Sequence, residues 1–270
     1  MTATKTEYEA AFDHGVASTP LQDVGNTTFA ILPDGYTVED IQSEKFQPAP
    51  SRIRAKVTLA DVASFTSYVN EFKVETDTKI FARREDSSLA AILDYHGDKP
   101  SWCTHTSHLQ LKSSPEWALW KPLHKANIAQ HAFAEFLEDR FVDIIEPDGA
   151  TILETAMNLE ARKTVVFKSG KNLSNGSTQL EYIEEIEGKG SAGGQLIIPS
   201  KFTIRVPIYY NGAPVDIPAR LRYRISDTKL SFTVIFERLE TIVDQAFADV
   251  LSVIAEATAI HPLLGSYAPG

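Results

Sequence analysis

Three arginines at alternate positions form the clearest pattern of charged residues in this 270-residue sequence. Arg220, Arg222 and Arg224 lie in the segment ARLRYRIS, in which apolar residues fill the positions between them. Successive side chains of a β-strand point to opposite faces, so the three guanidinium groups are predicted to share one face of a sheet. Cations in such a row are suited to contact the phosphates of a nucleic acid. We call these three residues the arginine row.

Two other interpretations of the arginine row fit the sequence. The return segment KLSFTVIFE carries Phe232, Val234 and Phe236 at alternate positions, as a half-buried hairpin with one hydrated face requires. The arginines could instead pair with acids of the segment EYIEEIE, within a chain or between subunits. These acids are Glu181, Glu184, Glu185 and Glu187. We favour a hydrated or ion-paired face, and nucleic-acid binding by the arginine row is the alternative.

One cysteine and two histidines lie close together in the segment SWCTHTSH, shortly after His96. On a continuous strand Cys103 and His105 would share a face and His108 would lie opposite, so the three side chains cannot converge without a bulge. No second pair of ligands at a zinc-site spacing is present in the sequence. We therefore assign no metal site, no cofactor and no catalytic residue. A hydrolase or ligand-sequestering pocket near His96–His108 is the third hypothesis.

The glycine-rich stretch GKGSAGG (188–194) resembles a phosphate-binding loop only superficially. A Walker A loop needs the pattern GxxxxGK[ST] between a strand and a helix, whereas here a strand is predicted to follow. We interpret the stretch as a mobile hairpin loop.

The periodicity of apolar residues predicts an α+β fold, with a mainly antiparallel β-sheet and helices packed on one face. Helices are expected over 59–72, 125–142 and 241–259, with Thr58, Thr151 and Thr241 opening capping-box patterns. Ser114 and Pro115 indicate the start of a further helix. Three short strands between 78 and 111 are expected to form an antiparallel meander, and about five strands follow Thr164.

Charge and proline positions divide the chain into three parts. Residues 1–45 are predicted to form an acidic arm with a short helix near Val38–Glu44, residues 46–260 one α+β body, and residues 261–270 a tail. A subdivision near 147–163 is left open. The net charge is −10, with eight acids and two bases in residues 1–50 and five acids and one base in 237–270. The rest therefore holds 36 − 13 = 23 acids and 26 − 3 = 23 bases, which disfavours non-specific coating of DNA.

The number of cysteines and the distribution of apolar residues indicate in which cellular compartment the protein is expected. Cys103 is the only cysteine, so no disulfide can form within the chain, and a reducing setting fits. The polar N-terminal segment has no apolar core of a secretory signal, and no run of about 18 apolar residues occurs. We expect a protein of the host-cell cytoplasm with no membrane contact.

Several longer segments resemble the YfdQ-like proteins of bacteriophages and prophages, a family without established function. The segments are LPDGY (32–36), PSRIRAKVTLADVASFTSYV (50–69), AILDYH (91–96), SPEWALW (114–120) and QHAFAEFLEDRFVDIIEPDG (130–149). The resemblance covers about residues 32–236. It implies an early or accessory phage gene, often near genes for DNA recombination, and it carries no catalytic residues.

Our leading functional hypothesis is a non-enzymatic phage or prophage accessory protein that assembles as a homo-oligomer. It is based on the missing catalytic set, the acidic chain ends, and the segment LIIPSKFTIRVPIYYNG, expected to be one long strand with edge-type prolines. The alternative partners are a nucleic acid, for a recombination or anti-defence factor, or a host or phage protein.

Overall fold

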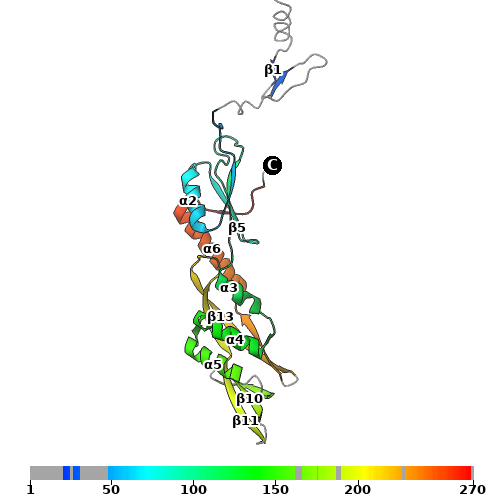
Figure 1. The fold of residues 1–270 in the computed structure, drawn as a ribbon. Helices are drawn as coiled ribbons and strands as arrows, with labels where there is room; N and C mark the ends of the chain where they lie inside the picture. Colours follow the sequence, from blue (N-terminus) through cyan, green and yellow to red (C-terminus); the bar gives the residue numbers. More distant parts are fainter. Residues whose placement is uncertain are drawn as a thin grey trace, which may run out of the picture. The chain divides into compact units, whose positions relative to one another are not determined.

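A computed structural model of the chain describes residues 21–24, 27–30, 48–161, 166–174, 176–186, 190–226 and 229–268. Residues 1–53 and 54–270 form two separate compact units. In the first unit, β1 (Leu21–Val24) and β2 (Thr27–Ala30) pair as an antiparallel hairpin (Figure 1). The short helix predicted near Val38–Glu44 lies outside the described residues. The predicted limits of the arm, body and tail stay predictions.

The first sheet of the second unit has the strand order β15-β4-β5-β6-β3. Its strands are β3 (Ala55–Leu59), β4 (Lys79–Arg83), β5 (Ser88–Ile92), β6 (His105–Gln110) and β15 (Leu263–Leu264). The predicted meander is confirmed, because β4, β5 and β6 pair antiparallel. Both outer strands are parallel to their neighbours, β3 to β6 and β15 to β4. Residues of the predicted tail therefore take part in the sheet.

Helix α2 (Val62–Phe72) begins later than the capping-box pattern indicates. Its N-cap is Asp61, whose carboxylate accepts the Ser64 N–H at 2.8 Å. The prediction that Thr58 caps this helix is wrong, because Thr58 lies in β3 opposite His108 of β6. Phe65 and Val69 of α2 are fully buried. The amphipathic helix predicted over this segment is confirmed, with its apolar face in the core.

Helix α6 (Leu239–Thr258) confirms the predicted C-terminal helix. It starts two residues before Thr241, because Arg238 adopts a left-handed backbone conformation (φ 49°) and precedes Leu239 as N-cap. The C-terminal ends of α2 and α6 are tied together, since Asn70 Nδ2 donates to the Ala257 carbonyl at 2.9 Å. Lys73 Nζ donates to the Thr258 carbonyl at 2.8 Å. Figure 1 shows the two helices side by side.

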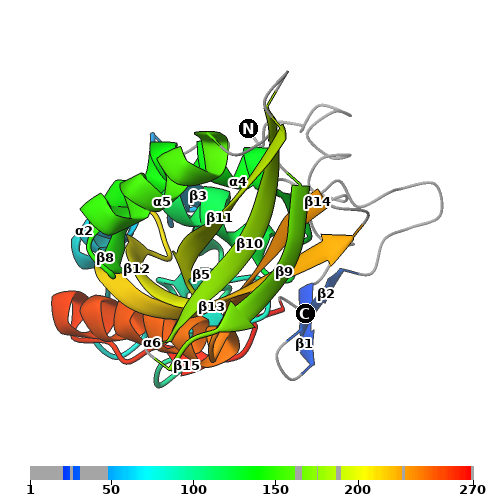
Figure 2. The ribbon, with the colours of Figure 1, turned by 90° about the horizontal axis from the view of Figure 1, so that it is seen from below.

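The second sheet has the order β7-β14-β13-β12-β8, and all its pairs are antiparallel. Its strands are β7 (Ile128–Ala129), β8 (Ile144–Glu146), β12 (Lys201–Pro207), β13 (Pro214–Ser226) and β14 (Lys229–Phe236). Side chains on one face are buried, among them Phe202, Ile204, Phe232 and Val234. Among the helices that contact this sheet are α3 (Pro115–Trp120), α4 (Gln130–Arg140) and α5 (Gly149–Ala161). Figure 2 shows α4 and α5 beside the sheet.

The helices over the second sheet differ in detail from the prediction. Helix α3 (Pro115–Trp120) starts at Ser114, whose hydroxyl accepts the Trp117 N–H at 2.9 Å, as predicted. Helix α4 (Gln130–Arg140) is shorter than the predicted 125–142, because Ile128–Ala129 pairs with β14 and Phe141–Asp143 forms the 3₁₀ turn η3.

Helix α5 (Gly149–Ala161) also starts before the position that the sequence pattern indicates. The carboxylate of Asp148 accepts the Thr151 N–H at 3.0 Å. The prediction that Thr151 caps this helix is therefore wrong, since Thr151 already lies within its first turn.

A third sheet, of order β11-β10-β9, corrects two predictions. It contains β9 (Val166–Asn172), β10 (Ser177–Ile186) and β11 (Gly190–Pro199). Gly190–Gly194 are strand residues paired with β10, not part of a loop. The predicted long strand through LIIPSKFTIRV is broken at Ser200, so that β11 and β12 belong to different sheets.

The third sheet packs against β13 and β14 through a glycine. The Tyr223 ring of β13 lies against Gly170 of β9, where a side chain would collide with it. Figure 2 shows β9 and β10 crossing the ribbon of β13. The predicted α+β class is confirmed, with sheets covered by helices and one continuous hydrophobic core in the second unit. No helix among the described residues is long and apolar enough to cross a membrane.

The hydrogen bond between Trp120 and Asp143 provides a test of the core. Trp120 is fully buried, and its Nε1–H donates to Asp143 Oδ2 at 2.8 Å. Replacing Asp143 by alanine leaves the indole N–H without an acceptor, which costs about 1–3 kcal/mol. We expect Asp143→Ala to lower the urea midpoint of unfolding. Asp143→Asn, which keeps an acceptor, should lower it less, and equal midpoints for the two variants would contradict this role.

Candidate functional site

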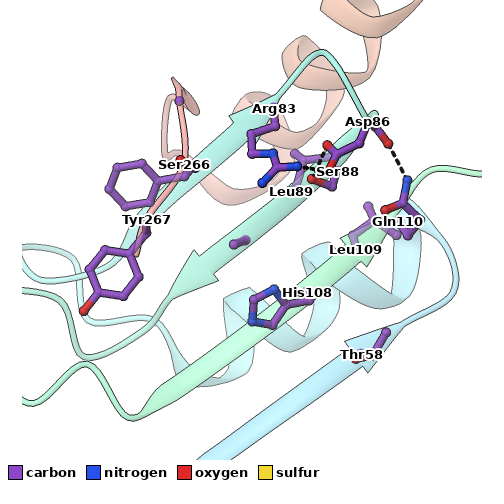
Figure 3. A pocket seen from close by; sticks show the side chains of 13 residues that line it. Thr58, Arg83, Asp86, Ser88, Leu89, His108, Leu109, Gln110, Ser266 and Tyr267 are labelled. Atoms are coloured by element: carbon purple, nitrogen blue, oxygen red, sulfur yellow. Dashed lines mark hydrogen bonds and ion pairs between the residues drawn. The ribbon is translucent and has the colours of Figure 1, made fainter. Parts of the chain in front are cut away.

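The polar face of the first sheet carries a groove of about 350 Å³. Strand alternation directs Thr58, Ser88 and His108 to this face, and the C-terminal residues Gly265–Tyr267 pass beside β4. Figure 3 shows Arg83 and Asp86 at one end of the groove, Tyr267 at the other, and His108 between them.

The charged residues of this groove are already engaged with one another. Arg83 pairs with Asp86, and the Ser88 hydroxyl donates to Asp86 Oδ1 at 2.6 Å. The Ser88 hydrogen bond is the main cause that lowers the pKa of Asp86. Burial opposes it, and the charge of Arg83 adds a smaller lowering effect. Asp86 is therefore held as a satisfied carboxylate, which makes it a poor proton acceptor.

His108 is the remaining titratable group on the floor of the groove. Burial, assisted by the positive charge of Lys56, lowers the pKa of His108. Its ring has no hydrogen-bond partner among the described residues, and its cross-strand neighbour is Ala90. A neutral imidazole without a nucleophile in contact does not form the pair that acyl transfer requires. The geometry of the groove thus gives no support to a hydrolase.

Cys103 and His96 meet in the loop before β6. Cys103 is buried, has φ 52°, and places Sγ 3.8 Å from His96 Nε2. Sγ also lies 4.0 Å from His96 Nδ1, but Nδ1 accepts the Ser101 N–H at 3.0 Å, so a neutral His96 carries its proton on Nε2. In this tautomer His96 cannot take the thiol proton.

The nearby carboxylate does not complete a catalytic triad. Asp94 accepts the backbone N–H groups of Thr104 at 2.8 Å and His105 at 2.9 Å, and therefore orients the chain rather than His96. A nucleophilic cysteine needs an oriented base, so this arrangement is structural. It also corrects one prediction, because Cys103 precedes β6 and does not continue the strand face of His105.

His105 and His108 lie on opposite faces of β6, as predicted. His105 is buried beneath α2, where Tyr68 Oη lies 2.8 Å from its Nε2 and Phe72 makes an edge contact. Burial lowers the pKa of His105, against the opposing effect of Asp94. Among the described residues no three His, Cys, Asp or Glu side chains gather as a set able to hold a metal ion.

The arginine row lies on the exposed face of the second sheet. Arg220 forms an ion pair with Glu237, with Nε 2.9 Å from Oε1. Arg222 and Arg224 are exposed, and no described side chain forms an ion pair with either. Their cross-strand neighbours on β14 are Thr233 and Ser231.

The partner of Arg220 was missed at the sequence level. Of the predicted acids, Glu181 accepts a hydrogen bond from Ser169 at 2.7 Å instead, Glu184 and Glu185 are described only in their backbone, and Glu187 lies outside the described residues. The hairpin register pairs Arg220 with Ile235, which makes Glu237 its diagonal neighbour. Counting residues outward from the turn between the segments ARLRYRIS and KLSFTVIFE would have found this pair.

A second hollow, missed by the sequence analysis, lies between α2, α6 and the loop that joins β12 to β13. Its volume is about 430 Å³, and its walls are mainly apolar. Segments far apart in sequence form it, so no local motif marks it.

Comparison with known proteins identifies a family but no function. A protein-family model described as "Uncharacterized conserved protein (DUF2303)" matches residues 5–267, which is nearly the whole chain. No curated protein and no solved structure matched the chain.

The contact between Tyr267 and Cys103 predicts an unusual titration. A hydrogen bond with Cys103, followed by burial, raises the pKa of Tyr267 from 10.0 to about 12. Because the folded pKa is raised, the stability from this group is complete below pH 10 and is lost as the pH rises towards 12. The part of the phenolate absorbance that is lost in the Tyr267→Phe variant should therefore titrate with a pKa of about 12.

A matched pair of cysteine variants tests the cause of that shift. Cys103→Ala should lower the pKa of Tyr267 towards its ordinary value, whereas Cys103→Ser keeps a hydrogen-bonding group and should leave it raised. Titration of Tyr267 at an ordinary pKa in the wild-type protein would rule out the contact.

Proposed function

We propose, for a chain that belongs to the family of uncharacterized conserved proteins designated DUF2303, that the protein is a non-enzymatic phage or prophage accessory protein working as a homo-oligomer. The observation that carries this proposal is the edge strand β11. It has ten residues, GSAGGQLIIP, and none of them is charged. Within the described part of the chain it pairs with β10 alone.

The two edges of the third sheet differ in how they are protected against pairing. Edge strand β9 carries the exposed residues Lys168 and Lys171, and its register with β10 shifts between Glu181 and Tyr182. Lysines and bulges are common devices that stop an edge from adding another strand. Edge strand β11 has neither device, because it pairs with β10 in unbroken register from Gly190 to Pro199. Its free edge is therefore suited to accept a strand from another copy.

Part of the described end of β11 is exposed to solvent. Helix α5 contacts β11, and in Figure 1 the β10–β11 hairpin extends past α4 and α5. Gln195 and Ile197 are exposed on the face opposite the core, with Ile197 56% exposed. A second copy whose β11 ran antiparallel to the first would extend the sheet across a two-fold axis. Backbone hydrogen bonds would hold the two subunits together.

The biological setting in this proposal comes from the sequence. Resemblance to YfdQ-like proteins supports a phage or prophage origin, and the single cysteine supports the host cytoplasm. The Cys103–His96 contact and the His108 groove contain no oriented nucleophile and base, which supports a non-enzymatic role.

Nucleic-acid binding is a second candidate, supported by the free part of the arginine row. Arg222, Arg224 and Lys229 follow one another along the exposed face of the β13–β14 hairpin, since Lys229 pairs with Ser226. Arg222 and Arg224 are about 6.8 Å apart along β13, twice the rise per strand residue, and Lys229 lies diagonal to Arg224 on β14. No acidic residue is paired with them among the described residues. This stripe of three cations is the part of the surface suited to phosphates.

The edge-pairing proposal predicts a mass above that of the 29.8 kDa chain in mass photometry. The double variant Gln195→Lys/Ile197→Lys should be a monomer, because antiparallel β11 strands would then place like charges opposite one another. The register sets Gln195 opposite Glu181, so the new lysine has a partner within its own subunit and the hairpin should still fold.

Val142→Lys is the matched control, because Val142 is an apolar residue of η3 with 70% exposure. It should keep the wild-type mass. A monomeric wild-type protein would overturn the assembly proposal, and an oligomeric double variant would overturn the assignment to β11.

Nucleic-acid binding predicts retention of a single-stranded DNA oligonucleotide on a filter, with log affinity falling linearly in log salt concentration. Arg222→Ala/Arg224→Ala should reduce that slope by about 2. Arg205→Ala/Arg220→Ala removes the same charge from arginines that already pair with Asp216 and Glu237, and should reduce it less. Absent retention in the wild-type protein, or equal slopes for both double variants, would dismiss the arginine row as a site.

A further inference from the structure

The hollow beside α6 is formed where two tied helices separate. α2 and α6 are joined at their C-terminal ends through Asn70 and Lys73. At the other end of α2 a space of about 430 Å³ opens between Val62 of α2, Val250 and Val253 of α6, and the loop over 208–213. This volume lies within the range of small-molecule sites, which is about 300–1,000 Å³.

The loop that closes the hollow is held at several points. The Tyr210 N–H donates to the Lys112 carbonyl at 2.9 Å, and Ser114 N–H donates to the Ile208 carbonyl at 3.0 Å. The Tyr209 hydroxyl lies 3.0 Å from Ser87 Oγ. The walls are therefore positioned before any ligand arrives, which reduces the entropy lost on binding.

All the charge in the lining is negative. Its only charged residues are Asp61 and Asp249, and neither forms an ion pair with a described residue. Asp61 accepts the Ser64 N–H at Oδ1 and the Ser64 hydroxyl at Oδ2, and Asp249 accepts from Gln245 Nε2 at 2.8 Å. Each carboxylate has about four lone-pair sites, so both keep acceptor sites.

Two further features favour a cation in this hollow. The charged residues of α6 are all acids, namely Glu240, Asp244, Asp249 and Glu256. Two tyrosines, Tyr209 and Tyr210, also line the hollow, and Tyr210 is 54% exposed. Aromatic rings and carboxylates are the groups that bind ammonium ions, whereas the valines and Ile208 provide an apolar wall.

We propose that this hollow binds a small organic cation, an amine with an apolar body. The apolar part lies between α2, α6 and the loop over 208–213, and the ammonium group lies at Asp249 and Asp61. This site does not depend on β11 or on the arginine row, so it can be tested in the monomeric β11 variant as well as in the wild-type protein.

Three probes of similar size separate charge from hydrophobicity in calorimetric titrations at neutral pH. They are 2-phenylethylamine as cation, 2-phenylethanol as neutral analogue and 3-phenylpropanoate as anion. We expect the amine to bind most tightly and the anion not to bind. Equal affinities for the amine and the alcohol would overturn the proposal.

Two asparagine variants locate the site. Asp249→Asn keeps the size and removes the charge, and should weaken binding of 2-phenylethylamine by about tenfold or more. Asp244→Asn makes the same charge change on the same helix, but Asp244 pairs with Arg84 and does not line the hollow, so affinity should stay within about twofold. Equal losses in the two variants would mean diffuse attraction to an acidic helix, and would overturn the site.

Discussion

The alternation of apolar and polar side chains along β13 and β14 is the constraint on which the rest of the second unit depends. It places Leu221, Tyr223 and Ile225 on one face with Phe232 and Val234, and the arginines on the other. A shift of one residue in the pairing would exchange the two faces, so the register is strongly fixed. The buried face then receives the helices and, through Tyr223 and Gly170, the third sheet. The core and the exposed arginine row are consequences of the same register.

Sequence periodicity predicted the elements better than their limits. The alternation in residues 219–236 fixed the β13–β14 hairpin, and the spacing of Phe65 and Val69 fixed the buried face of α2. Helix starts were misplaced because a threonine three residues before an acid occurs both at the N-cap of a helix and inside the strand that precedes a helix. Thr58 lies in β3, which pairs parallel to β6, and Asp61 is the N-cap of α2. Competition from a non-local strand cannot be read from a local pattern.

The candidate sites were predicted less well, because their parts come from distant segments. The glycine-rich residues 190–194 were predicted to form a loop, but they belong to β11. The Tyr182 ring of β10 lies against Gly194, where a side chain would collide with it, so this glycine allows packing within a sheet. The hollow beside α6 unites residues near 61, 208–213 and 250. Glu237 was found as the partner of Arg220 only once the hairpin register was known. In each case a tertiary contact, and not a residue type, defines the feature.

The net charge of −10 affects the three proposed contacts in different ways. Two copies of an acidic chain repel each other, so edge pairing through β11 must rely on short-range backbone hydrogen bonds and is opposed least when salt screens the repulsion. Contact of the arginine row with phosphates depends on counterion release and weakens with salt. The field of the acidic chain attracts an organic cation to Asp249, and salt weakens that attraction too. Salt therefore strengthens the subunit contact while it weakens both ligand contacts, which separates assembly from binding by a physical criterion.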